Sequence, residues 1–387
     1  MSLTLDRGAR DRRARAVAPH GEGTRVRRAE EDGARETLAA WDGLALVALV
    51  DWAVTLVRAV VCAALAGALG RGVGWERVGT RAAEAEAEAE TLVAGALVTG
   101  WSSGLGRASA IELARRGYAI VVPYRLGGLH SANELAEECR REAPEARVEL
   151  TGPLDLASER DVARMSFAAL RRRGVHVCVL VHCAAVFGEQ GRTSSESSSF
   201  DVNFRNAALL TEKFVKEMTE TSSSRLRVVF LGSFVHRCLT ARLLGLESFR
   251  RWLKPTHANR RREHSSAIDY MWSKVAISAY AAAKHEAWFK TYGGRVTAVL
   301  LDPGLVDTRL VRHWPAWLQM LYRTFGRASG LMKTPESAAR GVAIAVGLDV
   351  TSAECPQIFG SNGAPIGDSI WTRDARVRDM VGRSVAA

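Results

Sequence analysis

The feature that most constrains the fold of this chain is an alternation of two sequence patterns from Leu92 onward. Short runs of β-branched and other apolar residues alternate with longer stretches in which apolar residues recur every third or fourth position. Strands joined by helices in this way form a parallel sheet with helices on both faces, because a parallel connection needs a long crossover. Since the short runs are continuously apolar, we expect strands buried on both sides, within one domain at 93–387.

The two patterns also locate the individual elements. Predicted strands begin at Ala94, Tyr118, Arg147, Val175, Arg225, Arg295 and Pro356. Predicted helices span Arg107–Gly117, Ser131–Glu142, Glu159–Arg173 and Tyr270–Tyr292. Pro123 cannot donate a hydrogen bond to a neighbouring strand, so it should lie near the end of the second one.

The N-terminal part of the chain has a different composition. Residues 1–42 are rich in arginine and poor in large apolar residues, which predicts a disordered basic tail. Residues 43–72 predict a hydrophobic helix long enough to cross a bilayer core of roughly 30 Å, although Asp51 and Arg58 interrupt it. We expect this helix to associate with a membrane; it could span the bilayer, lie flat on its surface or pack on the domain. Residues 73–92, rich in Ala and Glu, predict a helical linker.

Composition and charge exclude some classes of protein. The hydrophobic fraction of 47% and the charged fraction of 25% are those of a globular domain with a sizeable core. The net charge of +11 would attract anionic lipid, nucleic acid or a phosphorylated cofactor. No nucleic-acid-binding motif is present, so we expect no nucleic-acid partner. The six cysteines are scattered without a CxxC pair, which argues against a disulfide framework and against a metal site.

A glycine-rich turn follows the first predicted strand. The sequence TGWSSGLG at Thr99–Gly106 opens directly into a predicted helix. Glycines allow a tight turn and a close approach by a pyrophosphate, while the N–H groups and the dipole at the start of the helix attract the anion. This arrangement is typical of a Rossmann-type, doubly wound sheet that binds a dinucleotide. The residues expected to contact the dinucleotide here are Thr99, Gly100, Ser102, Ser103, Gly104, Leu105 and Gly106.

The same turn resembles the TGxxxGxG signature of the short-chain dehydrogenase/reductase family, and the resemblance extends from Ala94 to the C-terminus. In that family the residue after the second strand contacts the adenosine ribose. Arg125 holds this position and favours the 2′-phosphate of NADP, with NAD as the alternative. Asp155 and Leu156 follow the third strand, where the family binds the adenine edge. Asp155 could instead cap the next helix, a role that Ser158 could also take.

The fourth predicted strand ends in a departure from the family pattern. His182-Cys183-Ala184-Ala185 stands where the family has Asn-Asn-Ala-Gly. The small Ala184 still allows the backbone to approach a cofactor, but the side-chain hydrogen bonds of the asparagines are lost. We interpret His182 as a buried, hydrogen-bonded residue rather than a catalytic one.

The resemblance also implies a catalytic set. Tyr270 and Lys274 form a YxxxK motif, and their i, i+4 spacing places both side chains on one helix face. The unperturbed pKa of tyrosine is about 10, and we expect the nearby ammonium to lower it so that the phenol can exchange a proton with a carbonyl oxygen. Ser233, after the fifth strand, resembles the family serine that binds the substrate oxygen. Asn203 resembles the asparagine that holds a water in the proton relay; otherwise it is an ordinary amide inside a helix.

A proline–glycine turn follows the sixth predicted strand. Pro303 and Gly304, with Thr308 downstream, resemble the family residues at the nicotinamide end of the cofactor. Every candidate residue therefore follows the carboxyl end of a strand, and in a doubly wound parallel sheet these ends line one crevice. We expect a single site in which NADP(H) meets a substrate.

The stretch from Pro303 to Val346 and the sequence LDLAS at Leu154 resemble the retinol-dehydrogenase-like branch of the family. This resemblance implies hydride transfer between NADP(H) and a small lipophilic alcohol or carbonyl, such as a retinoid, a steroid or an aliphatic compound. It also implies a membrane location, at the endoplasmic reticulum in preference to mitochondria. Two alternatives are a non-catalytic, cofactor-sensing membrane scaffold with the same fold and a basic nucleic-acid-binding protein. Substrate identity, reaction direction and oligomeric state stay open.

The segment Arg237–His264 is long and basic. It lies where enzymes of this branch build the substrate entrance, and its arginines could contact anionic lipid headgroups. An ordinary solvated insertion is an equal alternative.

Overall fold

The computed structural model describes Asp51, Val54 and residues 92–187, 198–237, 239–254, 266–312, 316–328, 330–350, 358–362, 365–366 and 370–386. The predicted tail at 1–42, hydrophobic helix at 43–72 and linker at 73–92 therefore lie outside the described residues, apart from Asp51, Val54 and Leu92. Within the described ranges, no helix has both the length and the hydropathy needed to cross a bilayer.

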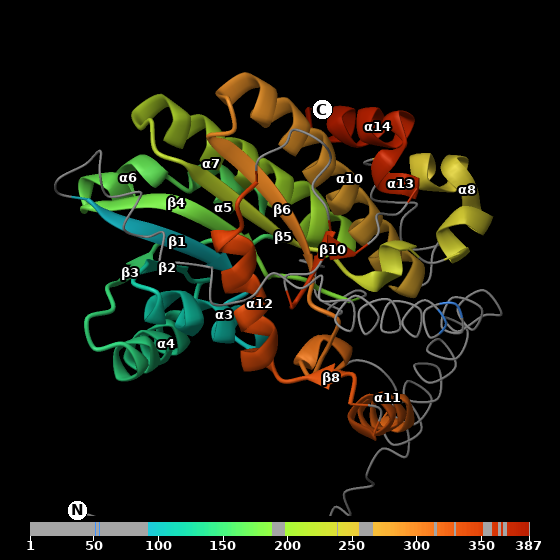
Figure 1. Cartoon of the computed structure of the whole chain (residues 1–387), viewed down its shortest axis with the longest axis horizontal. Coiled ribbons are helices and arrows are strands. Elements are labelled where there is room, and N and C mark those ends of the chain that lie inside the picture. The colour runs from blue at the N-terminus through green and yellow to red at the C-terminus, as the bar shows by residue number, and fades with distance from the viewer. Residues whose placement is uncertain are drawn as a thin grey trace, which may run out of the picture. The chain divides into compact units, whose positions relative to one another are not determined.

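The described residues form a central sheet of eight strands in the order β10-β9-β6-β5-β4-β1-β2-β3 (Figure 1). Every neighbouring pair is parallel except β9 and β10. From β3 to β6 this is the order of a doubly wound sheet, in which the strand order reverses between β1 and β4. The seven predicted strands are all found, and β10 is an addition. The strands are β1 (Val93–Thr99), β2 (Ala119–Pro123), β3 (Val148–Thr151), β4 (Val175–His182), β5 (Leu226–Leu231), β6 (Val296–Asp302), β9 (Ile358–Gly360) and β10 (Pro365–Ile366).

The two central strands, β1 and β4, end at the same level. Their register runs from Val93 opposite Val175 to Thr99 opposite His182. All eight residues of β4 are buried, as its continuous apolar run predicted. Because Thr99 and His182 are partners, the glycine-rich turn after β1 and the chain after β4 leave the sheet side by side. Pro123 is the last residue of β2, which confirms its predicted place at the strand end.

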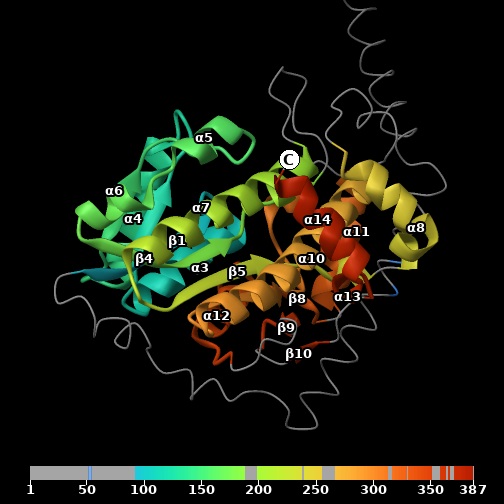
Figure 2. The ribbon, with the colours of Figure 1, turned by 90° about the horizontal axis from the view of Figure 1, so that it is seen from above.

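Helices cover both faces of the sheet (Figures 1 and 2). On one face α3 packs on β1 and β2, and α12 packs on β5, β6 and α3. On the other face α6 and α7 pack on β4, while α10 packs on β6. The predicted doubly wound α/β architecture is therefore confirmed. These helices are α3 (Gly104–Arg115), α4 (Leu129–Glu142), α6 (Phe167–Arg172), α7 (Asn206–Thr221), α10 (Ser266–Tyr292) and α12 (Pro335–Gly347).

One predicted helix, Glu159–Arg173, is two helices in the structure. The first is α5 (Glu159–Arg164), and the second is α6. The Oγ atom of Ser166 accepts a hydrogen bond from the N–H of Ala169 and so starts the second helix. A carboxylate oxygen of Glu217 in α7 accepts from two further N–H groups at the same helix start. The break depends on this long-range contact, which periodicity within the segment does not reveal.

The basic segment Arg237–His264 is partly described. Its helix α8 (Leu239–Trp252) packs Phe249 against Trp272 of α10, with ring centroids 5.1 Å apart. None of the described residues of the segment lines the cavity at the carboxyl ends of the central strands, and the predicted entrance stays a prediction. The arginines at 260–262 lie outside the described residues.

Short elements complete the described chain. A two-stranded sheet of β7 and β8 lies beside the main one. The remaining described elements are the π-helix η3 (Asp201–Arg205), the 3-10 helices η4 (Phe234–Arg237) and η5 (Arg309–Val311), β7 (Leu305–Val306), α11 (Ala316–Ala328), β8 (Met332–Lys333), α13 (Ile370–Arg373) and α14 (Ala375–Ala386).

Candidate active site

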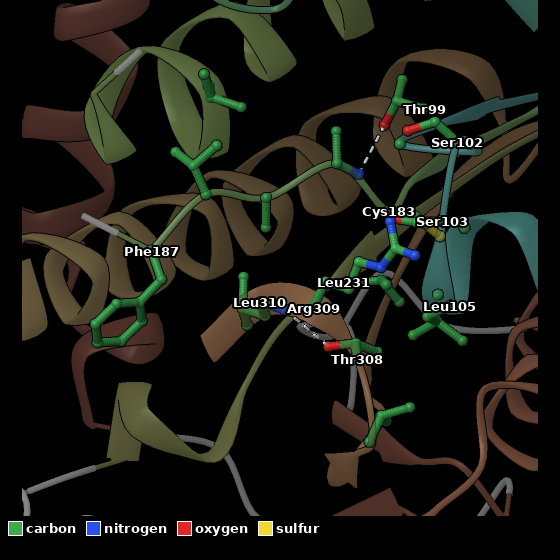
Figure 3. A pocket seen from close by; sticks show the side chains of 18 of the residues that line it. Thr99, Ser102, Ser103, Leu105, Cys183, Phe187, Leu231, Thr308, Arg309 and Leu310 are labelled. Carbon is green, nitrogen blue, oxygen red and sulfur yellow. Dashed lines mark hydrogen bonds between the residues drawn. The ribbon is translucent and has the colours of Figure 1, made fainter. Parts of the chain in front are cut away.

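A cavity of about 450 Å³ lies at the carboxyl ends of the central strands (Figure 3). In Figure 3 the loop residues Ser102, Ser103 and Leu105 lie toward one end of the cavity and Phe187 toward the other. The structure brings nearly every residue predicted for the site into this lining; Asn203 is the exception. The predicted residues that line it are Thr99, Gly100, Ser102, Ser103, Gly104, Leu105, Gly106, Arg125, Asp155, Leu156, Ala184, Ser233, Tyr270, Lys274, Pro303, Gly304 and Thr308.

The glycines of the turn stand where a side chain would strike backbone. A Cβ atom on Gly100, whose φ is +69°, would lie 2.6 Å from the Cα atom of Ala184. On Gly106 it would lie 2.3 Å from the carbonyl oxygen of Gly100. Gly104 has a φ of +54° and faces the Cγ2 atom of Thr308 at 3.1 Å. The turn therefore needs glycine both for its dihedral angles and for close contact with the chain after β4.

Two side chains hold the turn in place. The Oγ1 atom of Thr99 donates to the carbonyl of Val181 at 3.4 Å and accepts from the N–H of Ala184 at 3.2 Å. The indole N–H of Trp101 donates to the carbonyl of Pro123 at the end of β2. Trp101 is buried and was missed by the sequence reasoning, because it stands at a variable position of the motif. Together these bonds tie the turn to both neighbouring strands.

The cavity extends to the residues predicted for the adenosine end. Arg125 is exposed at its rim, and Asp155 and Leu156 lie in its wall. The Oδ1 atom of Asp155 accepts from the N–H of Ala157 at 2.9 Å. Ser158 is the residue that caps α5, because its Oγ atom accepts from the N–H of Asp161 at 3.2 Å. Of the two roles considered for Asp155, helix capping is therefore wrong.

The unusual end of β4 is braced by side chains from two helices. The Nε2 atom of His182 hydrogen-bonds the Oγ1 atom of Thr211 in α7 at 2.7 Å, and the ring stacks on Phe230 with centroids 5.1 Å apart. Burial lowers the pKa of His182 to about 3, so the ring is neutral. His182 is thus buried and hydrogen-bonded, as predicted. Next to it, the thiol of Cys183 points to Ser109 of α3 at 3.9 Å.

Tyr270, Lys274 and Ser233 form one cluster in the cavity wall. Tyr270 and Lys274 are 6% and 5% exposed and lie on the same face of α10. The Nζ atom of Lys274 donates to the carbonyl of Leu231 at 2.9 Å and lies 5.6 Å from the centre of the Tyr270 ring. The side chain of Ser233 is close enough to the Tyr270 phenol to lower its pKa. The phenol ring also contacts Phe187, with centroids 5.0 Å apart.

Burial dominates the electrostatics of this cluster. It raises the pKa of Tyr270 above the usual value; the hydrogen bond from Ser233 opposes this shift, and Tyr322 and Asp302 add to it. The lowering predicted from Lys274 is therefore wrong for this structure. Burial also lowers the pKa of Lys274 to about 8, so the ammonium is itself destabilised, and Nζ is directed at a carbonyl of β5. The phenol keeps its proton at neutral pH.

Asn203 braces the site from behind. Its Oδ1 atom accepts from the N–H of Val186 at 2.8 Å, and its Nδ2 atom donates to the carbonyl of Val186 and to the Oγ atom of Ser273 at 3.0 Å. Ser273 in turn donates to the carbonyl of Tyr270 at 2.7 Å. The side chain lies in η3, a π-helical turn of the kind often found at functional sites. It joins the chain after β4 to α10, and the predicted water relay stays a prediction.

A buried ion pair beside the site was not predicted. Asp302, at the end of β6, accepts from a guanidinium nitrogen of Arg237 at 2.8 Å through one oxygen and from the N–H of Gly304 at 3.0 Å through the other. The side chains of Asp302 and Arg237 are 4% and 16% exposed. The position of Asp302 directly before Pro303 was the available signal. Arg309, which also lines the cavity, was missed as well.

Comparisons with known proteins agree with this geometry. The family described as short chain dehydrogenase matches residues 94–238. A polyprenol dehydrogenase of Mus musculus is 30% identical over 281 residues, which cover 70% of this chain and 75% of the relative. Retinol dehydrogenase 14 of Homo sapiens is 28% identical over 286 residues, 70% of this chain and 77% of the relative.

Among solved structures, the promiscuous reductase LugOII has the same fold, with a TM-score of 0.50 at 20% identity over 70% of this chain and 97% of that one. The fold, the shared cavity and the identity to the polyprenol dehydrogenase together place the chain. It belongs to the retinol-dehydrogenase-like branch of the short-chain dehydrogenase/reductase family, the NAD(P)-dependent oxidoreductases.

Proposed function

We propose that this chain transfers a hydride between NADP(H) and a lipophilic alcohol or carbonyl. The observation that carries the proposal is the shared cavity, in which Tyr270, Lys274 and Ser233 face the same space as the turn Thr99–Gly106. A proton donor beside a dinucleotide-binding turn is the arrangement that carbonyl reduction needs.

The residues of the cavity fit a dinucleotide. The turn Thr99–Gly106 would hold the pyrophosphate, because its glycines keep side chains away from the start of α3, which has no acidic residue in its first turn. Arg125 at the rim supports NADP, since a guanidinium can pair with the 2′-phosphate. Pro303, Gly304 and Thr308 would lie at the nicotinamide end. A bound nicotinamide supplies the hydride in reduction and accepts it in oxidation.

The side chains of the cluster handle the proton and the substrate oxygen. In the direction of reduction, Tyr270 donates its phenolic proton to the carbonyl oxygen, and its raised pKa keeps that proton available at neutral pH. Ser233 would hydrogen-bond the same oxygen and fix its position beside the phenol. Lys274, held by the carbonyl of Leu231, stabilises the phenolate that Tyr270 becomes after it gives up the proton. For this the amine of Lys274 must carry its positive charge.

The rest of the lining supports a lipophilic substrate. Apolar side chains make up much of the cavity wall, and an apolar wall with a few polar groups binds a hydrocarbon while orienting its oxygen. Two of the relatives are named for polyprenol and retinol, which are both lipophilic alcohols. The apolar residues that line the cavity include Val186, Phe187, Leu231, Leu310 and Val311.

The test is oxidation of NADPH and NADH by the full-length protein with retinoid, steroid and aliphatic carbonyls. We expect NADPH to be preferred and Arg125→Glu to remove the preference. Tyr270→Phe should lower kcat about 10²–10⁴-fold, the usual share of general acid catalysis, while NADPH binding is kept. Turnover by Tyr270→Phe at the wild-type rate would refute the mechanism. NADPH binding by the wild type without turnover of any carbonyl would favour the scaffold alternative.

The location of the protein is a separate part of the proposal. Membrane association rests on the composition of residues 43–72, and the endoplasmic reticulum as its site rests on the resemblance to the retinol-dehydrogenase-like branch. Fractionation of cells that express the full-length protein should place it in the membrane fraction, and exchange of residues 43–72 for a polar sequence should release it.

A further inference from the structure

Helix α11 exposes large apolar side chains on one face. Trp317, Met320, Leu321 and Phe325 are 63%, 67%, 57% and 54% exposed. The other three follow Trp317 by three, four and eight residues, and this spacing places all four side chains along one side of the helix. Several large apolar side chains exposed on one helix face mark an interaction site, whereas single exposed apolar residues are ordinary.

The other sides of α11 are fixed to the protein. A Cβ atom on Gly326 would lie 2.7 Å from the Cε atom of Met332, so this side packs closely on β8. Tyr322 lines the active-site cavity, and burial raises its pKa to about 12. Arg327 pairs with Asp307, after β7, at 2.7 Å. Tyr322 and Gly326 hold the side of the helix away from the apolar face. Arg327 holds the border of that face beside Met320, so the helix cannot roll its apolar face inward.

The chain around this face is basic. From Thr308 to Thr334 the sequence has no acidic residue, and the nearby Asp307 pairs with Arg323 and Arg327. Two copies of this basic face would repel one another, and an acidic surface would attract it. The basic residues of this stretch are Arg309, Arg312, Arg323, Arg327 and Lys333.

An anionic lipid surface fits this combination. A helix that lies in a membrane interface has an apolar face with aromatic residues and arginine or lysine along its borders. Tryptophan favours the headgroup level, and basic side chains are attracted by anionic lipids. We propose that α11 lays Trp317, Met320, Leu321 and Phe325 into the surface of an anionic bilayer.

This docking would open the cavity toward the bilayer. Tyr322 belongs to α11 and to the cavity wall, and Leu310 and Val311, just before the helix, line the same cavity. A lipophilic substrate dissolved in the bilayer would then reach Tyr270 without crossing water. The step from docking to substrate entry rests on the proposed function; the docking itself does not.

The first experiment measures whether Trp317 of α11 enters the bilayer. Full-length wild type and Trp317→Phe are mixed with vesicles of phosphatidylcholine containing one quarter phosphatidylserine, with or without bromine on the acyl chains. Bromine quenches only tryptophans that reach the acyl region, so the difference in emission between the two proteins reports Trp317 alone. We expect brominated lipid to remove at least half of this difference. An unchanged difference overturns the proposal, even when the protein binds the vesicles through residues 43–72.

The second experiment uses a matched pair of surface variants. Leu321→Glu puts a charge on the apolar face of α11, whereas Leu243→Glu puts it on α8, where Leu243 is 68% exposed. Leu321→Glu should abolish the quenching of Trp317, and Leu243→Glu should preserve it. Sedimentation without lipid tests whether a second copy of the chain binds this face instead. A dimer that Leu321→Glu dissociates would show such a contact and overturn the lipid assignment.

Kinetics separate this inference from the proposed function. For a long-chain carbonyl carried in anionic vesicles, Leu321→Glu should raise KM about tenfold. For a short water-soluble carbonyl it should leave kcat and KM unchanged, because Leu321 does not line the cavity. If the wild type reduces neither carbonyl, the proposed function fails, and the quenching of Trp317 still decides whether α11 docks.

Discussion

The buried pair of Arg237 and Asp302 gives a prediction whose size follows from the structure. Asp302→Asn keeps the shape of the side chain and an oxygen that can accept from the N–H of Gly304. It removes the negative charge and leaves the guanidinium of Arg237, only 16% exposed, without its carboxylate. Arg237→Gln removes the opposite charge and leaves the carboxylate, which is 4% exposed.

Breaking a buried pair by removing one partner costs about 3–5 kcal/mol, because a charge stays buried without compensation. We expect about 3 kcal/mol for each single variant, since Arg237 is partly solvated and Asp302 keeps the hydrogen bond from Gly304. The double variant leaves two neutral amides and no unpaired buried charge, so the second substitution should add no more than about 1 kcal/mol to the loss. The coupling free energy between the two positions should therefore be about 2–3 kcal/mol.

The assay is urea unfolding of wild type, both single variants and the double variant at pH 7. Arg327 and Asp307 form the control pair, because they are as close, at 2.7 Å, but are 67% and 28% exposed. Their coupling should be about 0.2–1 kcal/mol. Additive effects at Arg237 and Asp302, with a coupling no larger than that of the control, would refute the reasoning that burial strengthens this ion pair.

The same substitution should shift the pH dependence of catalysis. Reduction needs Tyr270 protonated and Lys274 charged, so kcat/KM falls first as the pH rises through the lower of the two pKa values, that of Lys274 at about 8. Burial lowers the pKa of Lys274 and raises that of Tyr270, and the charge of Asp302 raises both. Removing the charge of Asp302 should lower both pKa values, and the fall in kcat/KM should begin at a lower pH. A fall that begins at the same or a higher pH would contradict this account.

Two further predictions concern the turn and the end of β4. Gly100→Ala and Gly117→Ala both force a side chain to a positive φ, at a cost of about 1–2 kcal/mol, but only Gly100 has backbone within 4 Å. NADPH titration should therefore show about tenfold weaker binding for Gly100→Ala alone, and equal weakening in both variants would disprove the role of close contact. The second variant is His182→Asn. Because the folded pKa of His182 is about 3 and the unfolded pKa about 6.5, stability present at neutral pH is lost as the pH falls below 6.5. His182→Asn should reduce the loss between pH 7 and pH 5 by about 2 kcal/mol in urea unfolding, and an unchanged loss would count against a neutral buried ring.

Sequence patterns were sufficient for the sheet and for the positions of the site residues. The strands were recognisable because a strand buried on both faces must be continuously apolar, as β4 is. The site could be assembled because its residues follow strand ends, and a parallel sheet brings those ends together. The turn at Thr99–Gly106 was visible because only glycine fits a positive φ with backbone 2.6 Å from the missing Cβ atom.

The parts that sequence reasoning missed depend on contacts between distant segments. The break before α6 needs Glu217 from α7, and Trp101 finds its acceptor at the end of β2. The direction of the Tyr270 shift depends on how much water burial removes, which the spacing of Tyr270 and Lys274 does not contain. The exposed apolar face of α11 was missed for the same reason, because the exposure of a helix face is known only when its neighbours are known.

The altered end of β4 shows which part of the family pattern the chemistry requires. The family pattern has two asparagines at this strand end, and their side-chain hydrogen bonds are lost in this chain. Here the imidazole of His182 bonds to Thr211 of α7, and the N–H of Ala184 donates to Thr99 at the end of β1. Both contacts fix the chain at the point where Gly100 approaches it, so the position of the backbone is kept while the side chains that secure it have changed. In the proposed function a cofactor would contact that backbone, and the small Ala184 leaves room for it. What the proposal requires at this strand end is a fixed backbone with no bulky side chain, and the contacts of His182 and Ala184 provide the fixed backbone.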